Sequence, residues 1–214
     1  SDVSYFDTEV YVSALGKSVK VRDYASACYI RTKWRVMNPA DGKYFWQDEN
    51  HNLTKLVKRA RELGLPVAFR VVVDGRDQGE NTPQFVFDAG ARFWLENDRY
   101  PDRKVPDVMD PVWRKYYEKF IEAFAEEFND PSKTAFIDAY GLGKWGEGHN
   151  VCYEGLVETS SGTYEGVVSD NTPEYKKNTM EWITSLYSRC FTKVPLVINY
   201  HRQIGHPKSS GKNA

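Results

Sequence analysis

Short runs of continuous apolar residues, separated by amphipathic helical segments, constrain this fold more than any other feature of the sequence. Runs that are apolar at successive positions, rather than at alternate ones, are typical of parallel strands covered on both faces. The predicted strands are residues 27–31, 66–73, 134–140 and 194–200, and the predicted helices are residues 53–63, 111–128 and 173–190. Strand and helix therefore alternate, which predicts βαβ units and a parallel sheet.

The predicted helices have specific boundary signals. Asp110 and Thr172 are expected N-cap residues, and a proline follows each of them at the first helical position. Gly64 is expected to end the first helix. A less regular pair of segments, residues 9–14 and 17–22, precedes the first parallel strand.

Two segments that follow strands, residues 74–106 and 141–171, are far longer than the usual connection of about 2–6 residues. Loops after the carboxyl ends of strands carry the site in α/β folds, so these loops favour part of a (β/α)8 barrel over a small open α/β sheet. Four strands do not close an eight-stranded barrel, which usually takes about 250 residues. We therefore expect residues 1–214 to be a single domain, an incomplete portion of a barrel within a longer polypeptide or a strand-completing assembly.

The composition argues against several classes of protein. The chain has 29 Lys and Arg against 30 Asp and Glu, so neither nucleic acid nor an anionic membrane is expected as a partner. No apolar run approaches the ~20 residues of a membrane span. The 3 Cys form neither a disulfide framework nor a zinc spacing. The aromatic content of 14% predicts dense core packing or, alternatively, rings that line a sugar-binding cleft.

The segment from Gly141 to Gly146 matches the pattern G-x-G-x-x-G directly after a predicted strand. A dinucleotide site would require a helix to begin there, and the residues that follow are polar and irregular, which argues against that site. The same segment favours a catalytic acid. Glu147 lies beside Trp145 and His149, and a carboxylic acid near an indole is partly desolvated, which raises its pKa and suits it to donate a proton. The alternative is a Glu in a solvated loop.

Metal binding and nucleophilic catalysis lack the expected residue patterns. Glu147, His149 and Cys152 are close in the chain, but their spacing matches neither a zinc site nor an EF-hand. The sequence has no G-x-S-x-G motif, and Cys28 and Cys190 lie on apolar faces that predict packing roles. We expect no metal and no cofactor.

Charged residues also occur inside predicted strands, where an unpaired charge is costly. These residues are Arg31, Arg70 and Asp138. They fit a buried ion-pair network that braces a barrel interior, and they equally fit a group of side chains that hold a substrate. Asn199 and His201 end the last predicted strand, where contact with a ligand is also expected.

Four segments, spread over roughly residues 27 to 201, match the motifs of one family. Residues 29–46 look like a W-x-x-(x)-P-x-x-G-x-Y-x-W segment, and residues 83–87 look like P-x-W-(V/L). Residues 105–117 are similar to the approach to a third barrel helix, and residues 137–149 to a strand end that reads G-x-W-G-E-(W)-H. Together they resemble the (β/α)8 glycoside hydrolases of the β-galactosidase-like clan A.

The resemblance implies about strands two to five of a (β/α)8 barrel that acts on a glycan by a two-carboxylate mechanism. It gives Glu147 the role of general acid/base, and it places the nucleophile on strand seven, outside this chain. Gly146 departs from the family, which usually has Asn before this Glu. A carbohydrate-binding barrel without hydrolysis and a small α/β nucleotide-binding domain remain as alternatives.

Several residues are expected to contact the glycan. Trp34 and Trp145 follow strand ends and are predicted to stack on sugar rings. Trp46 is a further candidate for stacking and equally fits a core position. The predicted substrate-binding residues are Arg31, Trp34, Arg70, Asp138, Trp145, His149, Asn199 and His201. The first residue is Ser1 rather than an initiator Met, which leaves open a processed chain in a secreted or periplasmic location. The sequence predicts no oligomeric state.

Overall fold

The structure is a computed structural model that describes most of the chain. The described residues are 3–75, 80–95, 104–148, 151, 154–158, 164–169 and 172–198. Three predicted substrate-binding residues, His149, Asn199 and His201, lie outside this part of the chain. No helix within the described ranges has both the length and the apolar character needed to cross a membrane.

Four parallel strands form the main sheet, and they confirm the four predicted strands. They are β3 (Cys28–Lys33), β4 (Val67–Val72), β7 (Thr134–Asp138) and β10 (Leu196–Val197). Their order across the sheet, read from one edge, is β10-β7-β4-β3. Read from the other edge, it is the order in which the strands follow one another along the chain. Each strand therefore lies beside the next one, with a helical crossover between them.

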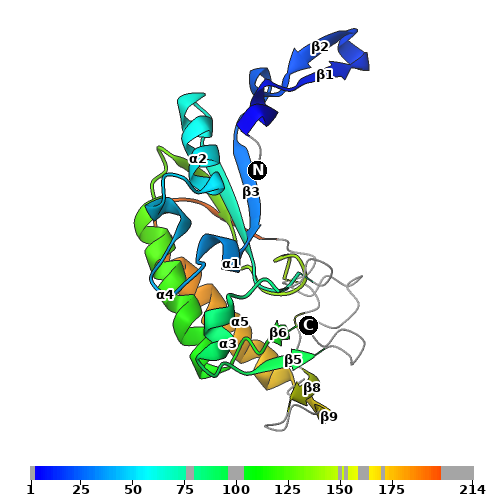
Figure 1. The fold of residues 1–214 in the computed structure, drawn as a ribbon, viewed down its shortest axis with the longest axis vertical. Coiled ribbons are helices and arrows are strands. Elements are labelled where there is room, and N and C mark those ends of the chain that lie inside the picture. Colours follow the sequence, from blue (N-terminus) through cyan, green and yellow to red (C-terminus); the bar gives the residue numbers. More distant parts are fainter. Residues whose placement is uncertain are drawn as a thin grey trace.

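Three long helices lie on one face of this sheet (Figure 1). They are α2 (Asn52–Glu62), α4 (Pro111–Phe128) and α5 (Pro173–Cys190). The predicted N-caps are confirmed. Asp110 accepts hydrogen bonds from the amides of Val112 and Trp113, and the Thr172 hydroxyl accepts one from the amide of Tyr175.

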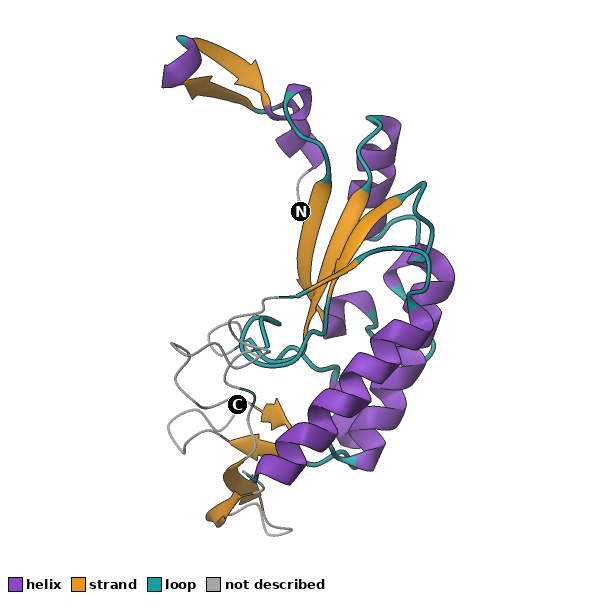
Figure 2. Ribbon diagram, turned by 180° about the vertical axis from the view of Figure 1, so that it is seen from behind, coloured by secondary structure: helices purple, strands orange, loops and turns teal. Residues whose placement is uncertain are grey.

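A sequential strand order with the helices on one face is the arrangement of part of a (β/α)8 barrel. A doubly wound nucleotide-binding sheet has helices on both faces instead. Figure 2 shows the parallel strands with the long helices on one side only. The predicted fold class, an α/β protein with part of a barrel, is confirmed, and the sheet face turned away from the helices corresponds to the barrel interior.

The two long loops form a second, antiparallel sheet that the sequence does not predict. It contains β5 (Phe93–Leu95), β6 (Lys104–Pro106), β8 (Glu154–Glu158) and β9 (Tyr164–Ser169), in the order β6-β5-β8-β9. Leu95 pairs with Leu156, which joins the loop after β4 to the loop after β7. Strands of three residues are too short to show the alternation that predicts a half-buried strand.

The remaining elements are short. β1 (Glu9–Val12) and β2 (Lys17–Lys20) form an antiparallel hairpin, which projects away from the parallel sheet (Figure 1). The short helices are α1 (Trp34–Met37) and α3 (Gln84–Asp88), and the 3-10 turns are η1 (Val3–Asp7), η2 (Ser13–Leu15), η3 (Val21–Asp23) and η4 (Phe45–Gln47). The irregular pair of segments predicted before the first parallel strand is thus a hairpin.

The core between the parallel sheet and its helices is rich in aromatic rings, and it contains Trp34. This residue begins α1 and is 0% exposed, with ring centroids 5.7 Å from Trp113 and 5.1 Å from Tyr117 of α4. The prediction that Trp34 stacks on a sugar is therefore wrong, because its ring is sealed inside the core. Trp46 is partly buried and stacks on Tyr44 at 4.7 Å, so its principal contacts are also with the protein.

Candidate active site

Arg31, Arg70 and Asp138 form one row across the parallel sheet. The register pairs Arg31 with Arg70, and Arg70 with Asp138. Residues directly opposite each other on neighbouring strands project from the same face of the sheet. Phe69 projects from the other face and packs on Phe124 of α4, so the charged row lies on the face away from the helices.

Arg70 is the centre of an ion-pair cluster in this row. Its Nε and Nη2 atoms donate to Oδ2 of Asp138 at 2.9 and 2.6 Å, and Nη1 donates to Oε1 of Glu147 at 3.0 Å. The hydroxyl of Tyr29 donates to the same Asp138 oxygen at 2.6 Å. The side chains of Arg70 and Asp138 are 14% and 11% exposed, whereas that of Glu147 is 30% exposed. Glu147 is therefore the most exposed of the three charged side chains in this cluster.

Burial and the two carboxylates set the charges in this cluster. Burial, followed by the hydrogen bond to Asp138, raises the pKa of the Tyr29 hydroxyl above its ordinary value, so this group remains a neutral donor. Burial acts to lower the pKa of Arg70, but its hydrogen bonds and the charges of Asp138 and Glu147 raise it overall. Arg70 is therefore a permanent cation that joins the two carboxylates.

The glycine-rich loop after β7 brings Glu147 to Arg70. Lys144 Nζ lies 2.8 Å from Oδ2 of Asp74, and both side chains are buried, at 5% and 8% exposure. The amide of Trp145 donates to the carbonyl oxygen of Asp74 at 2.9 Å, and the amide of Glu147 donates to that of Lys144 at 3.1 Å. These contacts anchor the loop to the segment after β4, three residues before Glu147.

Gly146 has a steric reason to be glycine. Its φ angle is +71°, and a Cβ atom built on it would lie 2.6 Å from the carbonyl oxygen of Val71 and 3.2 Å from Cγ of Arg70. The asparagine that the resembled family has at this position would collide with both groups. The departure from the family therefore follows from the close packing of this loop on β4 and is no evidence against a catalytic Glu147.

Trp145 lies in the same loop with an unusual backbone conformation. Its φ angle is 56°, a left-handed value that is uncommon for a bulky residue. Its side chain is half-buried, in contrast to the fully buried Trp34. Trp145 therefore remains partly exposed, and in the sequence it stands two residues before Glu147.

The structure brings Arg70, Asp138 and Glu147 into direct contact, but it places Arg31 differently from the prediction. Arg31 is exposed rather than buried, and it joins no ion pair within the described residues. The buried network therefore extends over β4, β7 and the glycine-rich loop, and it stops short of the Arg31 side chain on β3. The edge position of β3 in the sheet explains this exposure, because no described strand covers its outer side.

Three residues of the site were missed by the sequence analysis. Tyr29 precedes Arg31 by two positions, so period-two alternation would have placed it on the same face of the strand. Asp74 and Lys144 each follow the end of a neighbouring parallel strand, where their side chains meet at one edge of the sheet. The sequence around Asp74 gives no reason to expect a buried lysine beside it.

The alternatives of metal and dinucleotide binding have no support in the described part of the chain. Within it, no three His, Cys, Asp or Glu side chains gather as a metal site. The next described elements after the glycine-rich loop are β8 and β9, so no helix N-terminus faces a pyrophosphate there.

Comparison with known proteins gives only a distant likeness of fold. No family model matches this chain, and no curated protein sequence matches it. Among solved structures, endo-glycoceramidase II from Rhodococcus sp. is similar at 16% identity with a TM-score of 0.46, over 83% of this chain and 42% of that chain. A five-membered iminocyclitol complex of that enzyme gives 16% identity and a TM-score of 0.45, with the same coverage of both chains.

A third structure, the lactosyl-enzyme intermediate of the same enzyme, gives 15% identity, a TM-score of 0.46 and the same coverage. The chain thus spans about 42% of the length of the enzyme that it matches. A likeness at this level of identity and TM-score says nothing about the activity of this chain or the roles of its residues.

Proposed function

We propose that this chain is part of a glycoside hydrolase barrel in which Glu147 is the general acid/base. The observation that carries the proposal is the placement of Glu147 at 3.0 Å from Arg70, on the face of the parallel sheet that the helices leave uncovered. In barrels of this kind the site lies at the carboxyl ends of the strands. Arg70, which Asp138 holds through two hydrogen bonds, donates a hydrogen bond to Glu147.

Arg70 can serve both protonation states of Glu147. It donates two hydrogen bonds to Asp138, so Asp138 balances the guanidinium charge whichever state Glu147 takes. Oε1 of Glu147 accepts from Nη1 in both states, and the proton of the acid form is carried by Oε2. Donation of that proton to the glycosidic oxygen produces a carboxylate, and the guanidinium then stabilises it.

Asp138 positions Arg70 and does not act as the second carboxylate. Its Oδ2 atom accepts from Nε and Nη2 of Arg70 and from the hydroxyl of Tyr29. A nucleophile that carries three hydrogen bonds on one oxygen is weakened, because each donor stabilises the charge that must attack. We assign the partner carboxylate, which traps or stabilises the oxocarbenium-like centre, to a part of the barrel beyond this chain, as the family resemblance implies.

The remaining substrate contacts are part of the same proposal. Trp145 presents half-buried ring surface beside Glu147 and offers a platform for a sugar. In the sequence, His149 follows the glycine-rich loop, and Asn199 and His201 follow β10; we assign these three residues to substrate binding on that ground.

The test is the activity of Glu147→Gln in the full-length protein. The amide keeps an acceptor for Arg70 but cannot donate an acidic proton, so kcat/KM on a natural glycan should fall at least ~100-fold. Glu126→Gln, an exposed change on α4, is the matched control and should keep full activity. Equal activity of Glu147→Gln and wild type would remove Glu147 from the acid role.

A carbohydrate-binding barrel without hydrolysis is the second candidate, and the Arg70–Glu147 ion pair is the observation in its favour. A guanidinium at 3.0 Å stabilises the ionised carboxylate, which accepts hydrogen bonds from sugar hydroxyls but donates none. This candidate predicts glycan binding that Glu147→Gln weakens, with no cleavage by the wild-type protein.

A further inference from the structure

The row of charged residues on the open sheet face contains an arginine that forms no ion pair with any residue that the structure describes. Arg31 lies on β3, directly opposite Arg70 on β4. Neighbouring strands are about 4.8 Å apart, so two arginine side chains start from adjacent positions of the same face. Like charges in such a pair repel each other unless an anion lies between or beside them.

The guanidinium of Arg70 is already engaged by two carboxylates of the chain. Asp138 and Glu147 both contact its guanidinium, at 2.6 and 3.0 Å. Arg31 is exposed and makes no ion pair within the described part of the chain.

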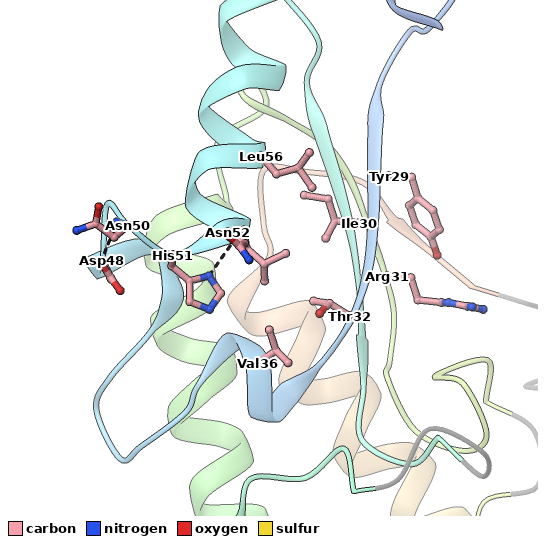
Figure 3. Close-up of a pocket in the computed structure, with 11 residues that line it drawn as sticks. Tyr29, Ile30, Arg31, Thr32, Val36, Asp48, Asn50, His51, Asn52 and Leu56 are labelled. Atoms are coloured by element: carbon pink, nitrogen blue, oxygen red, sulfur yellow. Dashed lines mark hydrogen bonds between the residues drawn. The ribbon is translucent and has the colours of Figure 1, made fainter. Parts of the chain in front are cut away.

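The side chain of Arg31 projects toward the face where a substrate would lie. In Figure 3, Tyr29 and Arg31 lie on one side of β3, whereas Ile30 and Thr32 lie on the other side, toward α2. Tyr29 is 45% exposed, so an aromatic surface accompanies the guanidinium. The pocket drawn there, ≈ 730 Å³ in volume, has Tyr29 and Arg31 in its lining, and most of its other lining residues lie on the α2 side of β3.

We propose that Arg31 binds an anionic group of the glycan, a carboxylate or a sulfate, so that the substrate class is acidic glycans. This inference rests on the proposed function for the placement of the substrate. The guanidinium is planar and presents paired N–H donors that match the two oxygens of such a group. Tyr29 would contact the apolar face of the same sugar.

The geometry separates recognition from cleavage. Arg31 and Asp138 lie two strands apart, a distance of about 10 Å across the sheet. Arg70 lies between them and is already saturated by Asp138 and Glu147. The anionic group therefore binds to one side of Glu147, on a sugar beside the bond to be cleaved.

The experiment measures binding rather than turnover, so that it remains informative if the protein hydrolyses nothing. Dissociation constants of the full-length protein are measured for uronic-acid oligosaccharides, for sulfated oligosaccharides, and for neutral oligosaccharides of the same backbone. Arg31→Gln should weaken binding of at least one acidic series by about 10-fold or more, the scale of hydrogen bonds to a charged group, with little effect on the neutral series. Arg31→Lys should recover only part of the loss.

Arg189→Gln provides the matched control, because it removes an exposed arginine from α5 on the helical side of the sheet. It should change neither series. Equal losses on acidic and neutral glycans would overturn the inference, since they would mean that Arg31 does not contact the anionic group. Absence of any acidic preference in the wild type would overturn it as well. Acidic binding that depends on Arg31, without cleavage, would support the inference and contradict the proposed hydrolase activity.

Discussion

The buried ion pair between Lys144 and Asp74 should anchor the loop that carries Glu147. The two side chains are 5% and 8% exposed and 2.8 Å apart, and they join residues 70 positions apart in the chain. Lys144→Met removes the cation and leaves the Asp74 carboxylate buried. Removal of one partner of a buried pair costs about 3–5 kcal/mol, because the remaining charge keeps its desolvation penalty without its compensation.

That cost is large compared with the stability of an ordinary domain, about 5–15 kcal/mol. We expect Lys144→Met to lower the urea midpoint by roughly 1–2 M, given the m-values of urea unfolding. The double variant Lys144→Met with Asp74→Leu removes both charges and should recover most of the loss. The exposed pair of Lys177 and Glu181 on α5 is the control, and Lys177→Met should cost only ~0.3–0.5 kcal/mol.

Urea unfolding of the wild type, of the single variants Lys144→Met and Asp74→Leu, and of the double variant measures the coupling between the two charges. Hydrogen exchange of residues 141–148 measures the local effect, because the Trp145 amide donates to the Asp74 carbonyl oxygen. This amide should exchange faster in Lys144→Met than in the double variant. A coupling energy below about 0.5 kcal/mol, or unchanged exchange in this loop, would refute the anchoring role of the pair.

Three further predictions address the glycine-rich loop, the tryptophans and the buried tyrosines. Gly146→Ala should lower the free energy of unfolding more than Gly42→Ala does in urea. Both glycines have positive φ angles, but only at Gly146 of the two would an added Cβ atom clash with its neighbours. Equal losses of stability would contradict the close packing of Gly146 on β4. Trp34→Ala should cost about 3–5 kcal/mol of unfolding free energy, because its ring is buried in the core. Trp145→Ala should weaken glycan binding and leave the unfolding free energy nearly unchanged. The reverse pattern would contradict the assignment of Trp34 to the core and of Trp145 to the sugar. Burial raises the pKa of the Tyr117 hydroxyl, so the neutral hydroxyl stabilises the fold below about pH 10, and this stabilisation is lost as the pH rises toward the folded-state pKa. Tyr117→Phe should therefore flatten the decline of the urea midpoint between pH 9 and 11, and an unchanged slope would contradict the prediction.

The parallel sheet and its helices were predictable because local signals specify them. The apolar run at residues 66–73 reads as a buried strand whatever its neighbours are, and Asp110 caps its helix through amides two and three residues away. The second sheet was not predictable, because β5 and β6 have three residues each and because β5 pairs with β8, which lies far along the chain. Its pairing depends on the parallel sheet being formed already.

The site was predictable as a set of residue types but not as a set of contacts. Glu147 follows a strand, and Arg70 and Asp138 are charges within strands, which suffices to single them out. The contact between Arg70 and Glu147 joins residues 77 positions apart and depends on the sheet register and on the turn at Gly146. The burial of Trp34 was equally hidden, since a tryptophan after a strand end fits both a sugar platform and a core position.

The role of Glu147 as a general acid is tested most directly by a series of aryl glycosides whose leaving groups differ in pKa. kcat/KM is measured for the full-length wild type and for Glu147→Gln across the series. A poor leaving group needs protonation and a good one does not, so the account predicts a loss that grows steadily with leaving-group pKa, reaching ~100-fold or more on the least acidic alcohols. A loss of the same size for every leaving group would mean that Glu147 binds or positions the substrate, and it would contradict the assignment of Glu147 as the proton donor.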